Sequence, residues 1–414
     1  MRFLSVVALL QLPLVLAADT VKNLVVFGDS NADVGNFQRW TNGPVWSEDL
    51  AVGWNATLHS FAYTGATCDR ARFSSVMRYD DSPSIKDQVE MYYHQSLNHD
   101  PAETVYAILV GASDIHKSFL QRVNSTSIPD LKPVVECIGQ QRNIRKMYGA
   151  NRFLVFNVLP MEHMPFYKDS SLAASRGEAA KEFNRLLAKE VTKMNKYHHA
   201  LALDLIDVHS LLSDLMANPT DFGFKDASSA YLGQCRERCD GRDVDKYVWW
   251  DRTHLTGGAH HMIANSILLA GSFAPSTSID AQKTIDALAL PNSPHRSPIY
   301  KSPPNTGIMD RLAAEAEQSS KKGATEPPEQ TLDDETVEPN NIANYVVIGG
   351  FVCAVLVYWT RRQKKITGRW PNPFQHISSR LRSTTFTPVR STDNVVHNFI
   401  AIESSVLSYS WRSL

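Results

Sequence analysis

Phe27-Gly28-Asp29-Ser30-Asn31-Ala32-Asp33-Val34-Gly35-Asn36 is the stretch of this 414-residue chain that says most about its fold. It follows a short apolar run, residues 23–27, which is typical of a buried strand. A Gly/Asp turn at the end of a strand exposes Ser30 at the edge of the sheet. The stretch fits a serine nucleophile, which needs this exposure and a nearby base. It also fits a simple strand-to-helix turn in which Ser30 caps the helix.

Similar apolar runs recur downstream, with helical segments between them. The expected strands are residues 23–27, 105–110, 152–157 and 200–206, and the expected helices are residues 84–98, 131–148, 177–194 and 257–269. Strands that alternate with helices predict a parallel sheet with helices on both faces, which is a three-layer α/β/α sandwich. Such sheets bind ligands at the carboxyl ends of their strands. We therefore expect the functional residues directly after the strands.

A second informative stretch, Trp250-Asp251-Arg252-Thr253-His254, stands just before the last expected helix. A short turn there lets the Asp251 carboxylate meet one imidazole nitrogen of His254 while the other faces a nucleophile. These are the roles of a Ser-His-Asp triad, in which Ser30 attacks, His254 moves the proton and Asp251 fixes the tautomer. An isolated Asp-x-x-His pattern also occurs where both residues only cap helices. Metal binding by the pair lacks an evident third ligand, so we expect no metal and no cofactor.

Together these stretches resemble the GDSL/SGNH hydrolase superfamily, in particular the fungal GDSL lipase/esterases that include acetylesterases of carbohydrate esterase family sixteen. The resemblance covers residues 21–273 and rests on four blocks in order. Residues 27–36 match every fixed position of the first block, with Asn31 where the motif's naming leucine stands. The later blocks are residues 61–68, residues 111–114 and the Asp251/His254 pair. The resemblance implies a flavodoxin-like three-layer fold and ester hydrolysis by acyl transfer.

The resemblance also implies an oxyanion hole. Its backbone donors would be the N–H groups of Ser30 and Gly65, and its third donor would come from the third block. The family has Gly-x-Asn-Asp there, whereas Ser113 replaces the asparagine in this chain. Removing one such donor costs roughly 10²–10³ in kcat. The residues that support the motifs are Gly28, Asp29, Asp33, Gly111 and Asp114.

Both ends of the chain predict a single-pass type I membrane protein. Residues 1–18 have the positive start, short apolar run and small final residues of a secretory signal peptide. Residues 342–360 form an apolar stretch of about the length that spans a bilayer, and basic residues follow at once. We expect an extracellular or lumenal hydrolase domain (21–273), a low-complexity stalk (274–341) and a basic cytoplasmic tail (361–414).

Cysteines and sequons agree with an exported domain. Four of the five cysteines, Cys68, Cys137, Cys235 and Cys239, precede the predicted membrane segment. Four cysteines allow three pairings, of which we favour Cys68–Cys137 and Cys235–Cys239. The sequons at Asn55 and Asn124 predict glycosylation.

Charge and motifs narrow the classes of function. The net charge of −1 provides no electrostatic attraction to nucleic acid. The expected partners are an acyl-ester substrate, carbohydrate or lipid, and a membrane that one helix crosses. Removal of acetyl or other short acyl groups from carbohydrate is the favoured reaction, and lipase or phospholipase activity is the alternative. A third hypothesis, motivated by Ser113, is a cell-surface binding protein that keeps the fold but has lost turnover.

Overall fold

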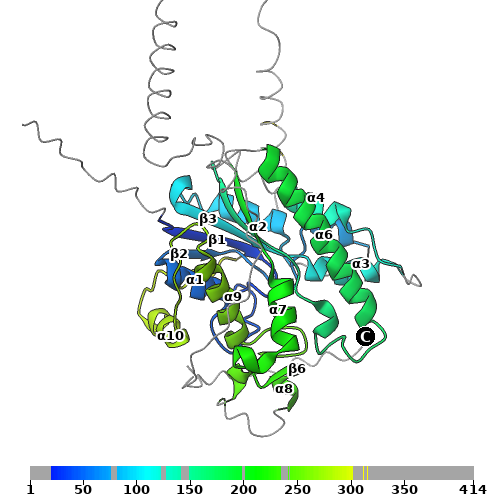
Figure 1. Cartoon of the computed structure of the whole chain (residues 1–414). Helices are drawn as coiled ribbons and strands as arrows, with labels where there is room; N and C mark the ends of the chain where they lie inside the picture. The colour runs from blue at the N-terminus through cyan, green and yellow to red at the C-terminus, as the bar shows by residue number, and fades with distance from the viewer. Residues whose placement is uncertain are drawn as a thin grey trace, which may run out of the picture. The chain divides into compact units, whose positions relative to one another are not determined.

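Five parallel strands form the central sheet of the protein (Figure 1). The structure is a computed structural model that describes residues 20–75, 82–122, 127–140, 149–197, 201–234, 241, 243–301, 311 and 315. The sheet has the order β2-β1-β3-β4-β5. Its strands are β1 (Asn23–Gly28), β2 (Thr57–Ser60), β3 (Thr104–Leu109), β4 (Arg152–Phe156) and β5 (Ala202–Ile206). The four predicted strands are confirmed close to their expected bounds, and β2 is an addition.

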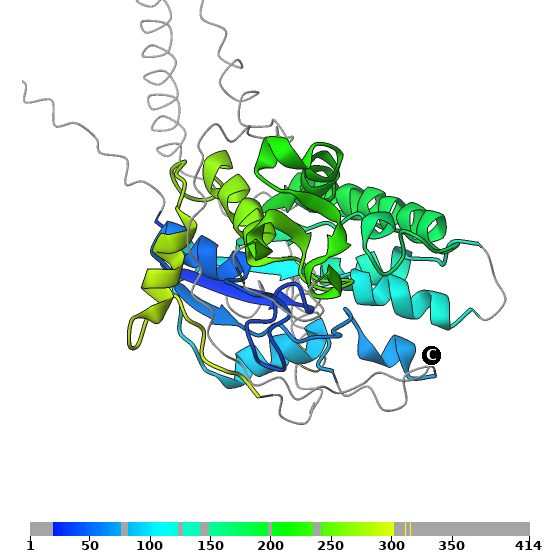
Figure 2. The same cartoon turned by 90° about the horizontal axis from the view of Figure 1, so that it is seen from below.

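Helices cover both faces of this sheet, so the predicted α/β/α sandwich is confirmed (Figure 2). On one face α1 (Trp46–Trp54) packs against α9 (Gly257–Ala270), and α7 (Val208–Ala217) lies beside them. The other face carries α2 (Ile85–His94), α3 (Ala112–Leu120), α4 (Lys132–Gln140) and α6 (Ala173–Tyr197). A small parallel pair of strands, β6 (Asp226–Ala230) and β7 (Tyr247–Trp249), precedes α9, and the short helix α8 (Tyr231–Gln234) lies between them in sequence.

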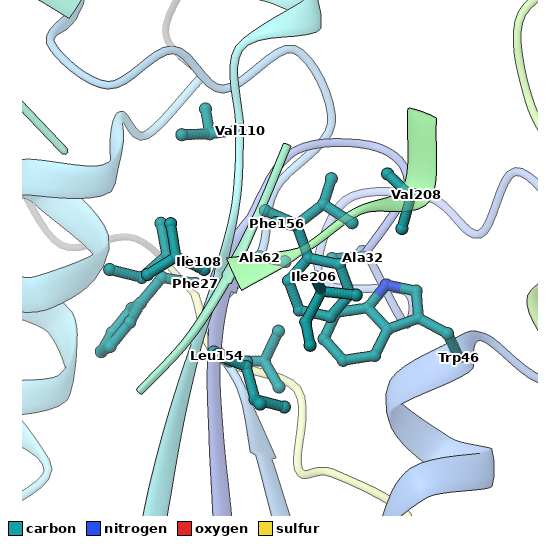
Figure 3. Close-up of a cluster of buried hydrophobic side chains, with 14 of the residues drawn as sticks. Phe27, Ala32, Trp46, Ala62, Ile108, Val110, Leu154, Phe156, Ile206 and Val208 are labelled. Carbon is teal, nitrogen blue, oxygen red and sulfur yellow. The ribbon is translucent and has the colours of Figure 1, made fainter. Parts of the chain in front are cut away.

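The core has two apolar layers because the central strands are buried on both faces (Figure 3). On the side of α1, the indole of Trp46 packs on the ring of Phe156 with centroids 4.4 Å apart. On the opposite side, Phe27 meets Tyr92 of α2 edge to face at 6.0 Å. All four side chains are buried. Strands of this kind read as continuous apolar runs, which is why the sequence predicts them well.

The folded domain extends beyond residue 273, where we expected a stalk to begin. Helix α10 (Ala281–Ala289) follows, and residues 293–301, called here the edge segment, lie along β2. The N–H of Leu58 donates to the carbonyl of Pro294 at 2.9 Å, and the N–H of Ser60 donates to Ser297 Oγ at 2.9 Å. The predicted boundary is wrong for residues 274–301, because α10 contacts α1 and the edge segment provides hydrogen-bond acceptors for the open edge of β2, despite a polar composition.

Some predictions concern residues outside the described part of the chain. These are the signal peptide, the rest of the stalk, the membrane segment, the basic tail, Asn124, and the cysteines Cys235 and Cys239. Within the described residues, none of the helices is both long enough and apolar enough to cross a bilayer. The predicted bond between Cys68 and Cys137 is confirmed. Asn55 is exposed at the carboxyl end of α1.

Candidate active site

Ser30 lies in the turn that directly follows β1, at the carboxyl edge of the sheet. The side-chain amide of Gln88 on α2 fixes the end of that strand. It accepts a hydrogen bond from the N–H of Gly28 at 2.8 Å and donates one to the Gly28 carbonyl at 2.9 Å. Ser30 itself is half-buried, and its hydroxyl makes no hydrogen bond among the described residues. The turn therefore holds an accessible hydroxyl on a rigid backbone.

Asp33 ties this turn to the second motif block. Its carboxylate is fully buried and accepts hydrogen bonds from the N–H groups of Gly35 at 2.9 Å and Asn36 at 2.8 Å. It also accepts from the N–H of Thr64 at 2.9 Å and from its hydroxyl at 2.8 Å. Thr64 immediately precedes Gly65, so one carboxylate sets the distance between the nucleophile turn and the predicted oxyanion loop.

The candidate oxyanion donors converge on the same edge. Among the described residues, the N–H groups of Ser30 and Gly65 donate to no protein acceptor. Gly65 has a φ of +79°, and a Cβ there would lie 2.9 Å from Ser82 Oγ, so the position favours glycine. Lys117 Nζ donates to the Gly65 carbonyl at 2.9 Å and thereby orients the peptide.

Ser113 lies in the first turn of α3, two residues after Gly111. Gly111 has a φ of +137°, and a Cβ there would come within 2.7 Å of Val158 and Phe183. Only glycine allows the chain to turn sharply from the end of β3 into α3. Ser113 is half-buried, and its hydroxyl makes no hydrogen bond among the described residues.

Asp251 and His254 form the hydrogen-bonded pair that their spacing predicts. Asp251 Oδ2 and His254 Nδ1 lie 2.7 Å apart, and Asp251 Oδ1 accepts from the N–H groups of Thr253 at 2.7 Å and His254 at 2.8 Å. Burial raises the pKa of the Asp251 carboxyl, but the hydrogen bonds and the charge of His254 outweigh burial and hold the pKa below its usual value. The carboxylate is therefore ionised and aims the imidazole.

The loop that carries this pair is held on two sides. The N–H of Trp250 donates to the carbonyl of His254 at 2.8 Å, and the N–H of Phe166 donates to the carbonyl of Arg252 at 2.9 Å. The charge of His254 also acts on Asp29, the residue before Ser30. The histidine thus interacts electrostatically with the residue before the nucleophile, although more than 200 residues separate them in sequence.

Trp40 packs directly on His254. The indole and imidazole ring centroids are 5.1 Å apart and the ring planes differ by 15°. Trp40 Nε1 donates to Thr64 Oγ1 at 2.9 Å. The tryptophan therefore bridges the loop after Ser30, the loop before Gly65 and the histidine.

Asp29 and Asp114 are buried carboxyls behind the site. Burial raises the pKa of Asp29 to about 6, although the Asn31 N–H and the charge of His254 oppose this shift. Burial also raises the pKa of Asp114 to about 7, against the Cys68 N–H and the charge of Lys117. The N–H of Cys68 donates to both Asp114 oxygens, at 3.0 and 3.2 Å. These two carboxyls hold backbone in place rather than face substrate.

A small internal cavity lies behind the nucleophile turn. Its polar lining includes Asp29, Asn31 and His260, and each has a buried side-chain atom without a partner among the described residues. Burial lowers the pKa of His260 to about 3, and the charges of Arg39 and His254 lower it further. His260 is therefore neutral. In the described part of the chain, no cluster of three His, Cys, Asp or Glu residues has the geometry to hold a metal ion.

Sequence reasoning missed the residues that support the site from a distance. Gln88 and Lys117 have no motif that distinguishes them from ordinary surface or helix residues, and Thr64 lies in the second motif block without any sign of its contacts. Trp40 could be found only as an aromatic residue close to the nucleophile in sequence. Their roles depend on contacts between segments 24 to 214 residues apart, such as Thr64 with Trp40 and Trp40 with His254.

A serine after the first strand and an Asp–His pair before the last sheet-covering helix, at the ligand edge of a parallel sheet, are the components of a serine hydrolase with a Ser-His-Asp triad. The model of the family described as GDSL-like Lipase/Acylhydrolase matches residues 24–267. The chain belongs to this family of ester hydrolases.

Individual relatives are distant. The thermolabile hemolysin of Vibrio parahaemolyticus is 24% identical over 60% of this chain and 64% of its own length. GDSL esterase/lipase 5 of Arabidopsis thaliana is 26% identical over 42% of this chain and 51% of its own. This chain thus spans about half to two thirds of these curated relatives.

Two further matches carry acetylesterase names. An acetylesterase of Hypocrea jecorina is 21% identical over 60% of this chain and 88% of its own length. The solved structure of an acetylxylan esterase from Geobacillus stearothermophilus, a catalytic mutant, is 12% identical and covers 60% of this chain and 93% of its own, with a TM-score of 0.36.

Proposed function

We propose that this protein is a serine ester hydrolase with Ser30 as nucleophile, His254 as general base and Asp251 as the residue that orients the base. The observation that carries the proposal is the 2.7 Å hydrogen bond between Asp251 and His254 Nδ1. The charge of His254 also acts on Asp29, the residue before Ser30. Because the carboxylate occupies Nδ1, Nε2 is the nitrogen that accepts the Ser30 proton. Membership of an ester-hydrolase family supports the same reaction class.

The reaction proceeds by acyl transfer. Ser30 Oγ attacks the ester carbonyl as His254 takes its proton, and the carbonyl oxygen becomes an oxyanion that the N–H groups of Ser30 and Gly65 receive. His254 then protonates the leaving alcohol, and an acyl-enzyme on Ser30 results. Water that His254 activates hydrolyses this ester and regenerates Ser30. A histidine must be neutral to act as base, so hydrolysis falls below about pH 6. Unchanged hydrolysis at pH 4 would contradict the assignment of the base.

Ser113 supplies the third oxyanion donor in this proposal. Its half-buried hydroxyl at the start of α3 makes no other hydrogen bond among the described residues, so it is available to rotate toward the oxyanion. A hydroxyl is shorter than the asparagine amide of the family pattern and less well oriented. The enzyme is therefore slower than one with asparagine there.

The substrate we favour is a short acyl ester, an acetyl group above all, on a carbohydrate. The acetylesterase of Hypocrea jecorina supports this choice, since it matches over most of its own length. Lipase or phospholipase activity is the second candidate, and the names of the plant esterase/lipase relatives favour it. The binding-protein hypothesis has weaker support, because Ser30, Asp251 and His254 are all present and two of them are paired.

The proposal includes the topology expected from the sequence. Residues 1–18 direct export, residues 342–360 anchor the chain, and the tail from 361 faces the cytoplasm. Glycosylation at Asn55 and Asn124 would then occur on the exported side. Digestion of the full chain with an N-glycosidase and extraction of membranes at alkaline pH test this topology. An unglycosylated protein that alkali extracts would overturn it.

Hydrolysis of p-nitrophenyl acetate and of a longer-chain p-nitrophenyl ester by the purified full chain tests the function. We expect Ser30→Ala to abolish turnover, and we expect Ser113→Asn to raise kcat by about tenfold, since it replaces the hydroxyl with a longer and better-oriented oxyanion donor. Preference for acetate over the longer chain would favour the acetylesterase, and the reverse the lipase. If neither the folded wild type nor Ser113→Asn cleaves any ester tested, the binding-protein hypothesis replaces this one.

A further inference from the structure

We infer that Trp40 is a positioning residue that stabilises the imidazolium form of His254 while ester hydrolysis proceeds. The inference rests on the proposed function, since it concerns the base of that reaction. Trp40 is half-buried, ten residues after Ser30, and it lies outside every motif block. Its contact with His254 gives it an influence on the reaction that the motifs do not reveal.

The contact has the geometry of an offset stack. The ring centroids are 5.1 Å apart and the planes differ by 15°, which is within the range that aromatic pairs prefer. The imidazole is fixed at its Nδ1 edge by Asp251 and across its face by the indole. Two contacts from different directions define the plane of the ring, and with it the direction of Nε2.

Trp40 is itself anchored. Its indole N–H donates to Thr64 Oγ1 at 2.9 Å, and Thr64 donates to the buried carboxylate of Asp33 at 2.8 Å. Thr64 also precedes Gly65, the candidate oxyanion donor. The chain Asp33–Thr64–Trp40–His254 therefore connects the nucleophile turn, the oxyanion loop and the base, so that the three move together.

The stack favours the transition state over the ground state. As the general base of the proposed reaction, His254 gains a proton as Ser30 attacks. A cation within about 6 Å of an indole centroid is attracted by the ring face, and a neutral imidazole gains less from it. Interactions that strengthen in the transition state raise kcat, whereas equal binding of both states does not. For a partly exposed pair, the attraction corresponds to roughly 3- to 30-fold in kcat.

Other charged groups near His254 stay in place when Trp40 is changed. Asp251 bonds its Nδ1, the carboxyl of Asp29 interacts with it electrostatically, and the neutral imidazole of His260 is affected by its charge. Asp29 lies in the nucleophile turn and His260 on α9, so neither depends on the indole for its position. A Trp40 substitution therefore isolates the effect of the aromatic face.

The experiment compares Trp40→Leu, which removes the aromatic face, with Trp40→Phe, which keeps a face but loses the N–H. Phe37→Leu is the matched control, because Phe37 is an aromatic residue of the same loop that is 66% exposed. For each full-length variant, kcat and KM for p-nitrophenyl acetate are measured from pH 4.5 to 8.5. An NMR titration of the His254 imidazole is recorded in parallel, and circular dichroism verifies folding.

For Trp40→Leu we expect kcat to fall roughly 3- to 30-fold with little change in KM. The acid limb of the pH profile and the His254 titration should both move to lower pH, because the imidazolium is less favoured. Trp40→Phe should lie between wild type and Trp40→Leu, and Phe37→Leu should match wild type. Unchanged kcat and an unmoved His254 titration in Trp40→Leu would overturn the inference, as would a rise in KM alone.

This design separates the inference from the proposed function. If Ser30→Ala retains the activity of wild type, the proposed function fails. The NMR titration still tests whether the indole stabilises the imidazolium, and an unmoved midpoint in Trp40→Leu contradicts it. If activity depends on Ser30 but Trp40→Leu behaves as wild type in both measurements, only the inference fails.

Discussion

The carboxyls of the partly buried Asp251 and of the fully buried Asp29 and Asp114 belong to one site, yet their surroundings move their pKa values in opposite directions. Burial raises the pKa of all three, and it prevails for Asp29 and Asp114, to about 6 and about 7. At Asp251 the hydrogen bonds and the charge of His254 prevail, and the pKa is lowered. The comparison distinguishes Asp251, whose carboxylate orients a neighbouring base, from Asp29 and Asp114, whose carboxyls hold the backbone in place.

The largest effect should follow from Asp251→Asn. The amide cannot hold His254 in the tautomer that leaves Nε2 as the base, so we expect kcat to fall by about 10⁴ while KM changes little. Asp114→Asn is the matched control, since it makes the same chemical change at a carboxyl that accepts a hydrogen bond from the Cys68 N–H and does not bond His254. If the two variants lose kcat for p-nitrophenyl acetate to the same extent, the distinction between the two kinds of carboxyl is contradicted.

Loss of the disulfide should affect stability far more than catalysis. The bond joins Cys68, whose N–H holds Asp114, to Cys137 of α4, 69 residues away. Closure of a loop of that size contributes about 4 kcal/mol to the free energy of unfolding in the chain-entropy account. Cys68→Ala with Cys137→Ala should lower the urea midpoint accordingly. At low temperature, kcat of the folded double variant should stay close to wild type, and a kcat loss comparable to Asp251→Asn would contradict this.

The smallest effect concerns the pH dependence of stability. The folded-state pKa of Asp114, about 7, lies above its ordinary value of 3.8. The folded protein therefore keeps a proton that the unfolded chain releases, and this contribution to stability is lost as pH rises from about 4 through 7. Asp114→Asn has no such dependence. From pH 5 to pH 8, the free energy of unfolding of Asp114→Asn should therefore increase by about 1–3 kcal/mol relative to that of wild type.

Urea unfolding of both proteins at several pH values measures this difference. The comparison with wild type removes the contributions of other groups, such as His59, whose pKa burial lowers to about 4 with a further effect of His99. A difference that is constant with pH would mean that Asp114 has the same protonation in the folded and unfolded states.

The sequence predicts most of the sheet because strands buried on both faces are continuous apolar runs. It does not predict β2, whose four residues Thr57–Ser60 include a threonine, a histidine and a serine. The edge segment is missed for a related reason. Its Pro- and Ser-rich composition is typical of a linker, but Tyr300 is buried against Phe61, with ring centroids 4.1 Å apart.

The candidate site also has residues whose positions the sequence predicts and residues whose contacts it does not. Asp251 and His254 are three residues apart, so a local turn suffices to pair them, and the pairing can be predicted. The block order also predicts that Ser30, Gly65 and Ser113 meet at the carboxyl edge of the sheet. The contacts of Trp40 with His254 and of Lys117 with the Gly65 carbonyl join distant segments, and no local pattern encodes them.

Covalent labelling with a fluorophosphonate, followed by mass spectrometry of the digested full chain, tests most directly whether Ser30 is a nucleophile that the Asp251–His254 pair activates. The account predicts one adduct on the peptide that contains Ser30, no such adduct in Ser30→Ala, and much slower labelling in Asp251→Asn. An unlabelled wild-type chain, an adduct on another residue, or labelling of Asp251→Asn at the wild-type rate would contradict it.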